Sequence, residues 1–314
     1  MNVFNLANKM RYYIKSNACN AQTAERSNML WTEILSGDFE KAVEKSKGVC
    51  GLVVGCVEHH GRHLPLGMDV FHTAGVAELA AKKEPFVLFP HMYFGEKQGA
   101  GEFKGTIIFS SKLMFDILTE SCDEMARNGF KKIVLINGHG GNTAMLSNFA
   151  RSVLHEKKDY MVFNYGIVSA WPKVKQMLKM IDAGDRRFSS LTEEDIAVLR
   201  NFAENNTASG HGDLLETAML LGYRPELVDM SRVNDVDGRS THLLDHLARA
   251  GFSTHYSWMS SFPNSLSSDA HDGNNERIGK CVVRLAADKM AADFKVLKED
   301  TVCEQYHKLW LSKQ

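Results

Sequence analysis

The sequence predicts an α/β fold of three layers, in which helices cover both faces of a mostly parallel sheet. Short apolar runs typical of buried strands occur at 51–54, 86–89, 132–136 and 160–165. Amphipathic stretches typical of helices alternate with these runs, which is the pattern of an α/β domain with a parallel sheet. Polar, glycine-bearing turns follow the first and third runs, and ligands bind at such strand ends in open α/β sheets.

The remaining elements follow from helical spacing of apolar residues. Helices are expected at 39–45, 70–81, 111–128, 143–155, 193–204, 214–220, 241–250 and 276–294. Residues 1–50 form a polar, helical N-terminal extension in this prediction, packed on the core. No repeat, low-complexity segment or linker divides residues 51–314, so these are expected to form one domain.

Composition excludes several classes of partner. The 37 Lys and Arg residues nearly balance the 38 Asp and Glu residues, so the chain lacks the positive charge that nucleic acids or anionic membranes attract. No apolar run approaches the roughly 20 residues of a membrane span, and the N-terminus lacks the pattern of a signal peptide. The six cysteines form no C-x-x-C pair, as is typical of reduced thiols. We therefore expect a cytoplasmic protein with no nucleic-acid or membrane partner.

Candidate metal ligands follow the first strand. Residues 55–69 contain two carboxylates and three imidazoles. Glu58 and His60 are two residues apart, so an extended backbone directs both side chains to the same side. Asp69 comes after a loop with proline and glycine that can fold back toward them. These three side chains are therefore expected to converge at the carboxyl end of the strand.

Two further clusters need the same explanation. The sequence N-G-H-G-G-N at 137–142 follows the third strand, and His211 and Glu216 lie at the start of a helix. Any one of these residues alone would more simply belong to a turn or to a solvated surface. Three clusters that each follow a strand or open a helix indicate a metal site instead, because divalent cations accept mixed histidine and carboxylate ligands. A carboxylate such as Asp69 can bridge two ions about 3.5–4 Å apart.

These motifs resemble those of the creatininase (creatinine amidohydrolase) family. The family pattern E-x-H-G-x-H-L-P-L-x-x-D stands nearly complete at 58–69, and N-G-H-G-G-N stands at 137–142. The resemblance spans roughly residues 50–295 and implies a creatininase-like catalytic domain within 51–314. It implies that Glu58, Asp69 and His139 hold one metal ion. His60, Asp69 and a further carboxylate would hold a second one.

The further carboxylate is the point at which this chain differs from creatininase itself. In creatininase, that carboxylate ligand lies two residues after the histidine that corresponds to His139. Gly141 occupies that position here and cannot bind a metal. Glu216 matches the glutamate that other branches of the family use, and His211 matches the family's histidine for proton transfer. The departure assigns this chain to the N-G-H-G-G-N branch and argues against creatinine as its substrate.

The resemblance implies a binuclear metal-dependent hydrolase. Metal-activated water would open a small cyclic substrate at an amide C–N bond. Two alternatives stay open: hydrolysis of a C–C bond in a cyclic diketone, such as an inositol-derived 3-dehydro-scyllo-inosose, and metal binding without catalysis. Two Zn ions per chain are the expected cofactors, with Mn or Fe as alternatives. The resemblance also implies a homo-oligomer, often a hexamer.

Weaker expectations concern the surroundings of the metal ligands. Three residues are expected in the substrate pocket: Trp171, Gly105 and Thr106. Three others are expected to hold the ligands in place: His63, Asn137 and Asn142. Cys56 is expected to be a small apolar filler. His242 and His246 are four residues apart on the helix expected at 241–250, where a surface pair is favoured over a metal site.

Overall fold

A buried, all-parallel sheet forms the centre of the molecule. The computed structural model describes residues 29–97, 99, 101–205, 210–270 and 272–313. The four strands of its sheet lie in the order β2-β1-β3-β4. They are β1 (Val49–Val54), β2 (Val87–Leu88), β3 (Lys132–Asn137) and β4 (Met161–Gly166). Every residue of β1 is buried, which explains why the predicted strand is a continuous apolar run rather than an alternating one.

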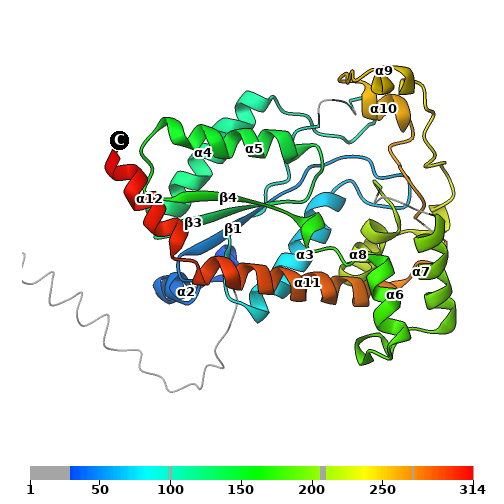
Figure 1. The fold of residues 1–314 in the computed structure, drawn as a ribbon, viewed down its shortest axis with the longest axis horizontal. Coiled ribbons are helices and arrows are strands. Elements are labelled where there is room, and N and C mark those ends of the chain that lie inside the picture. Colours follow the sequence, from blue (N-terminus) through cyan, green and yellow to red (C-terminus); the bar gives the residue numbers. More distant parts are fainter. Residues whose placement is uncertain (1–28, 98, 100, 206–209, 271, 314) are drawn as a thin grey trace, which may run out of the picture.

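Helices cover both faces of the sheet (Figure 1). Helices α4 (Ser111–Arg127) and α5 (Asn142–Ser152) lie on one face, and α3 (Met68–Lys83) and α11 (Glu276–Glu299) lie on the other. The strand order explains this division. Strand β2 lies on one side of β1 in the sheet, and β3 and β4 lie on its other side. Right-handed crossovers therefore place α3 on the opposite face of the sheet from α4 and α5. The predicted three-layer α/β/α fold is confirmed.

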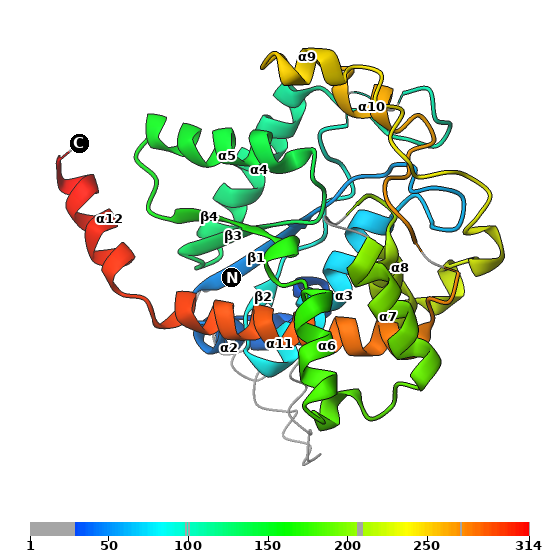
Figure 2. The same cartoon turned by 45° about the vertical axis from the view of Figure 1, so that its right-hand side comes forward.

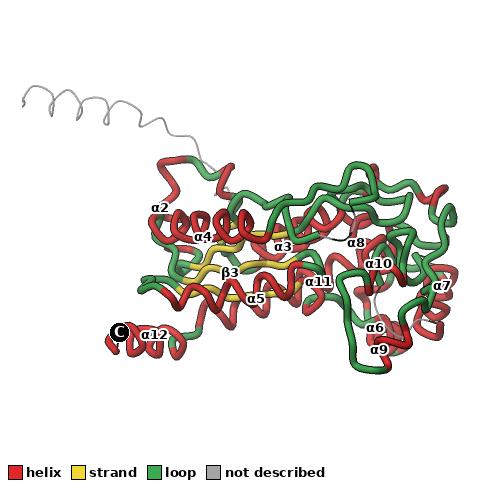
Figure 3. Tube along the Cα trace, turned by 90° about the horizontal axis from the view of Figure 1, so that it is seen from above, coloured by secondary structure: helices red, strands yellow, loops and turns green. Residues whose placement is uncertain are grey.

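The other helices lie around these layers. Helix α8 (Leu214–Tyr223) packs on both α11 and α3, while α6 (Val174–Asp182) and α7 (Glu193–Asn205) pack on each other (Figure 2). The remaining α-helices are α2 (Phe39–Lys45), α9 (Asp245–Arg249), α10 (Ser257–Ser261) and α12 (Val302–Lys313). Long loops gather beyond the carboxyl ends of the strands, at the end of the molecule opposite α12 (Figure 3).

Short 3-10 helices connect several of these elements. They are η1 (Trp31–Glu33), η2 (Ser36–Asp38), η3 (Val153–His155), η4 (Ile167–Ser169), η5 (Arg186–Phe188), η6 (Pro225–Leu227) and η7 (Met230–Arg232). Residues 1–28 lie outside the described part, so the helical N-terminal extension over 1–50 stays a prediction, as does the division into two parts. None of the described helices is both long and apolar enough to cross a bilayer.

Several elements differ from the sequence-based expectation, and neither α6 nor α10 was expected. The helix expected at 241–250 is limited to Asp245–Arg249, because His242 has a left-handed backbone with φ of 57°. His242 therefore precedes the helix and pairs with Asp245, and the two histidines do not share a helical face. Helix α12 was not expected; it buries none of its residues, so the apolar periodicity that marks a core helix is weak there.

A buried lysine near the end of α11 connects three segments. Lys298 is 8% exposed, and its Nζ donates to the carbonyl oxygens of Pro85 at 2.8 Å and Lys45 at 3.3 Å. The same ammonium pairs with the carboxylate of Glu84. Since Lys45 ends α2 and Pro85 precedes β2, one side chain stabilises the start of the sheet against α11.

We predict that Lys298→Met lowers the free energy of unfolding by about 2–4 kcal/mol, because Glu84 and two carbonyl groups lose a buried donor. Urea denaturation of the variant and the wild type measures the difference. Lys295→Met is the control, because Lys295 lies on the same helix, is exposed and is 3.9 Å from Glu299. Its expected effect is within about 0.5 kcal/mol, and equally small changes in both variants would contradict the argument.

Candidate metal centre

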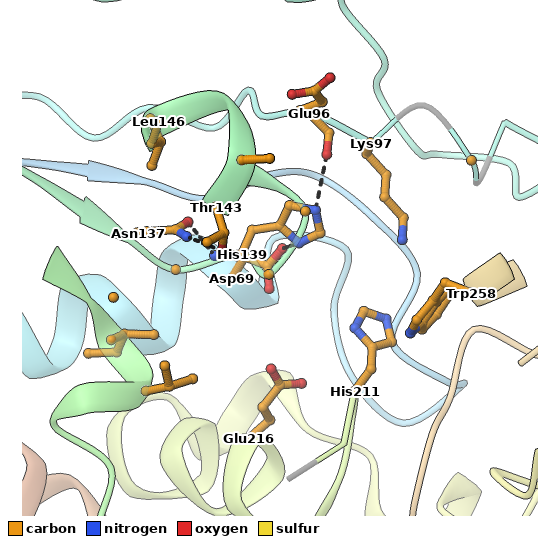
Figure 4. A pocket seen from close by; sticks show the side chains of 18 of the residues that line it. Asp69, Glu96, Lys97, Asn137, His139, Thr143, Leu146, His211, Glu216 and Trp258 are labelled. Atoms are coloured by element: carbon orange, nitrogen blue, oxygen red, sulfur yellow. Dashed lines mark hydrogen bonds and ion pairs between the residues drawn. The ribbon is translucent and has the colours of Figure 1, made fainter. Parts of the chain in front are cut away.

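Four segments meet beyond the carboxyl ends of β1 and β3. Val54 pairs with Asn137 in the parallel register, so the loops that carry Glu58 and His139 leave the sheet side by side. The start of α3 adds Asp69, and the turn before α8 approaches from another side. Together these segments line a cavity of about 870 Å³ (Figure 4).

The five residues predicted as metal ligands lie together in this region. His139 Nδ1 is 2.8 Å from Glu58 Oε1 and 3.1 Å from Asp69 Oδ2. His60 Nε2 is 3.1 Å from Asp69 Oδ1 and 3.7 Å from Glu216 Oε2. All five side chains are buried. The Asp69 carboxylate thus lies between two imidazoles, with one imidazole at each of its oxygens.

The donor set fits divalent cations. Ligand-type atoms within 4.8 Å of one another form three sets: Cys56, Glu58, Asp69 and His139; Glu58, His60 and His211; and His60, Asp69 and Glu216. The first and the third sets share Asp69. Three buried carboxylates in close contact repel one another unless cations lie between them. Imidazole nitrogen and carboxylate oxygen are ligands that zinc and similar metals accept.

The charges of this cluster shift the pKa values of its histidines and carboxylates. Burial alone lowers the pKa of His139, but the adjacent Glu58 and Asp69 carboxylates raise it to about 10. Burial would likewise lower the pKa of His60, but Asp69 and Glu216 raise it to about 9. Burial raises the pKa of Glu216 to about 8. Without metal, protons on these groups therefore neutralise part of the negative charge.

His211 differs from the other histidines of the site. Burial, together with the neighbouring His60, lowers its pKa to about 3, so the imidazole is neutral at neutral pH. Its Nε2 is 2.7 Å from the carbonyl oxygen of His59, which fixes the hydrogen on Nε2 because a carbonyl only accepts. The ring stacks on His60 at 3.9 Å between ring centroids. Nδ1 therefore carries the lone pair, which is able to accept a proton or to bind a metal.

The three residues predicted to support the ligands contact the elements that carry them. His63 Nε2 is 2.9 Å from the hydroxyl of Thr217, the residue after the candidate ligand of α8. Asn137 Oδ1 accepts from the backbone N–H of His139 at 3.0 Å. Asn142 donates to backbone oxygens at the end of β1. Each contact links a loop of the site to a neighbouring segment, although their roles in metal binding stay predictions.

Two glycines allow the backbone to approach the site closely. A Cβ atom at Gly138 would lie 2.3 Å from Thr73 Oγ1 and 2.5 Å from the carbonyl oxygen of Asp69. A Cβ atom at Gly141 would lie 2.4 Å from His139 Nε2. A side chain at either position would displace one of these groups. Position 141 therefore supplies no ligand, and the side chain of Glu216 enters the site from α8 instead.

The predicted pocket residues have different locations. Trp171 lines the cavity, and its indole Nε1 is buried without a hydrogen-bond partner among the described residues. Gly105 and Thr106 are not among the described residues that line the cavity. The assignment of these three residues to substrate binding stays a prediction.

Two residues of the site were missed in the sequence. Cys56 is buried, as expected of an apolar filler, but its thiol also donates to Asp69 Oδ2 at 3.0 Å. The spacing of Cys56, Glu58 and His60 was an available signal, because alternate residues of an extended segment point to one side. Lys97 lies with Nζ 2.6 Å from Glu58 Oε2, and no local pattern pointed to this contact between distant segments.

Known proteins are similar to this chain in sequence and in fold. The family model described as creatininase, creatinine amidohydrolase, matches residues 32–294. A creatinine amidohydrolase from Pseudomonas putida is 25% identical over 210 residues, which cover 65% of this chain and 75% of that protein. A mycofactocin precursor peptide peptidase from Mycobacterium tuberculosis is 28% identical over 116 residues, which cover 34% of this chain and 46% of the peptidase.

Solved structures agree with this relationship at the level of the fold. A manganese creatininase matches with a TM-score of 0.66 and 18% identity, covering 87% of this chain and 100% of that one. A zinc–zinc form of a mutant creatininase matches with a TM-score of 0.65 and 19% identity, covering 87% and 99%. Since the family model matches most of the chain, this protein belongs to the creatininase family of metal-dependent hydrolases.

Proposed function

We propose that this protein is a binuclear metal-dependent amidohydrolase that opens a small cyclic substrate at an amide C–N bond. The observation that carries this proposal is the pair of ligand sets that share Asp69. Glu58, Asp69 and His139 would hold one ion, and His60, Asp69 and Glu216 would hold the other. The zinc and manganese forms of related structures support divalent ions of this kind, with Zn favoured. The family resemblance is also our ground for proposing a homo-oligomer, and the cysteine pattern is our ground for proposing a cytoplasmic location.

The mechanism assigns proton transfer to the protein. Bound divalent ions supply an acidified water and polarise the amide carbonyl. His211 is neutral and has its lone pair on Nδ1, so it would accept the proton of the attacking water. The same imidazole would then donate this proton to the leaving nitrogen. Addition of water thus yields a carboxylic acid and an amine, with one proton of the water carried to the nitrogen by His211; the acid then passes its proton to the amine, which gives a carboxylate and an ammonium.

The substrate class is open to a direct experiment. The cavity of about 870 Å³ has room for ligands larger than a single small ring, and Trp171 lies in its wall. Metal-loaded protein would be screened against lactams, cyclic ureas and inosose-type ketones. Turnover of a lactam or cyclic urea supports amide hydrolysis, whereas turnover of the ketones alone supports cleavage of a C–C bond.

Substitution of ligands should remove the metal and the activity together. We expect about two ions per chain in the wild type, and reduced metal content with no detectable turnover in Glu216→Gln and His139→Ala. Elemental analysis of purified protein measures the ions. Glu226→Gln is the control, because Glu226 pairs with Arg224 on the surface. Full turnover in a ligand variant that had lost its metal would refute the proposal.

Metal affinity should rise with pH. Metals bind the deprotonated ligands, so binding must release the protons held on His60, His139 and Glu216, whose pKa values are about 9, about 10 and about 8. We expect release of about three protons at pH 7, measured by calorimetry in buffers of different ionisation enthalpy. Because the two imidazole pKa values are raised on folding, the metal-free protein should lose stability as the pH rises through about 9 and about 10. A pH-independent affinity would contradict this expectation.

His211→Gln should separate proton transfer from metal binding. We expect kcat to fall by about 10²–10⁴-fold, the usual contribution of general acid–base catalysis, while metal content stays at the wild-type level. Steady-state kinetics and elemental analysis of the same preparation provide both readouts. Loss of one ion in the variant would instead make His211 a ligand, which its contact with Glu58 and His60 also allows.

A further inference from the structure

We propose that Lys97 binds a carboxylate of the substrate, so that this site selects cyclic amides that carry a negative charge. The inference rests on the proposed function, since it concerns the same cavity in the metal-loaded protein. It assigns a specificity-determining role to a lysine that none of the predicted motifs contains.

The Lys97 ammonium lies inside the cavity. Its Nζ is 2.6 Å from Glu58 Oε2 and 4.3 Å from the centre of the Trp258 ring, and the side chain is 11% exposed. Figure 4 shows the amino end directed toward the space between His139 and Trp258. An ammonium has three N–H donors, and its ion pair with the Glu58 carboxylate is the contact that holds this one in place. Lys97 therefore has donors left for an anionic group that enters this space.

The backbone next to Lys97 is fixed to the site. The N–H of Glu96 donates to Asn142 Oδ1 at 2.7 Å, and the carbonyl oxygen of Glu96 lies 3.2 Å from His139 Nε2. The carboxylate of Glu96 accepts from the Ser111 hydroxyl at 2.9 Å and is directed away from His139 (Figure 4). The loop thus places the positive charge of Lys97 at the reacting centre and turns the neighbouring negative charge away.

The charge of the loaded site favours an anion. The three carboxylates of Glu58, Asp69 and Glu216 together with one hydroxide balance two divalent ions. Lys97 then adds one positive charge at the reacting centre, and it is the one lysine or arginine among the described residues that line the cavity. Glu96 also lines the cavity, but its carboxylate is bonded to Ser111 and directed away from His139. A single positive charge in a site of low dielectric favours a substrate with one negative charge over a neutral one. A carboxylate matches this charge, whereas a phosphate dianion exceeds it.

Two lactams that differ only in a carboxylate test the proposal. Calorimetry on the metal-loaded protein would compare 5-oxoproline with 2-pyrrolidone. We expect the wild type to bind 5-oxoproline about 10–100-fold more tightly, as for a charged hydrogen bond in a buried site. Lys97→Met should reduce this ratio to about one with metal content unchanged, and Lys97→Arg should keep most of it.

Lys104→Met is the matched control, because Lys104 belongs to the same loop but is exposed and lies outside the cavity. This variant should keep the wild-type ratio. A ratio near one in the wild type, no binding of either lactam, or an unchanged ratio in Lys97→Met would overturn the proposal. If Lys97 served only to neutralise Glu58, the substitution would change metal affinity and leave the ratio intact. Failure of the proposed function is distinguishable, because it would appear as missing metal in the wild type.

Discussion

The contact of one carboxylate with two imidazoles determines how the site is built. Asp69 is buried and contacts His60 through one oxygen and His139 through the other. Leaving such a carboxylate buried without its partners would cost several kcal/mol. The loops after β1 and β3 must therefore meet the first turn of α3 in a single arrangement. The parallel register of β1 and β3 supplies that arrangement, so the sheet and the site depend on each other.

The negative charge of the site is a second constraint, which couples metal binding to the state of the protein. Without metal, imidazolium groups and the Lys97 ammonium compensate the buried carboxylates. A metal ion must replace some of these positive charges, which links its affinity to the release of protons. Lys97 differs from the imidazoles in this respect, because an ammonium has no lone pair with which to bind a metal. In our proposal, Lys97 compensates the charge of the buried carboxylates when no metal is bound. When the metal ions are bound, the same ammonium is available to the substrate.

The sequence contained the information for the fold and for most of the candidate ligands, because that information is local. Apolar runs marked the strands, and Glu58, His60 and His139 follow strands that parallel pairing brings together. Lys97 could not be found in this way, since its contact with Glu58 depends on how a long loop folds back. The left-handed backbone of His242 likewise depends on its surroundings, and it shortened an otherwise plausible helix.

The proposed ligand Glu216 comes from α8 and not from the turn after β3. Gly141 leaves no space for a side chain beside His139, so the turn after β3 cannot supply the further carboxylate. Asp213 caps α8 by accepting from the N–H of Glu216 at 3.1 Å, and Gly212 donates to Glu216 Oε2 at 2.6 Å. The carboxylate is thus held by the first turn of a helix that packs on α3 and α11, on the other side of the sheet from α5. Lys97, His139 and Glu216 line the same cavity, so the proposed partner of the substrate carboxylate and the proposed metal ligands face one space.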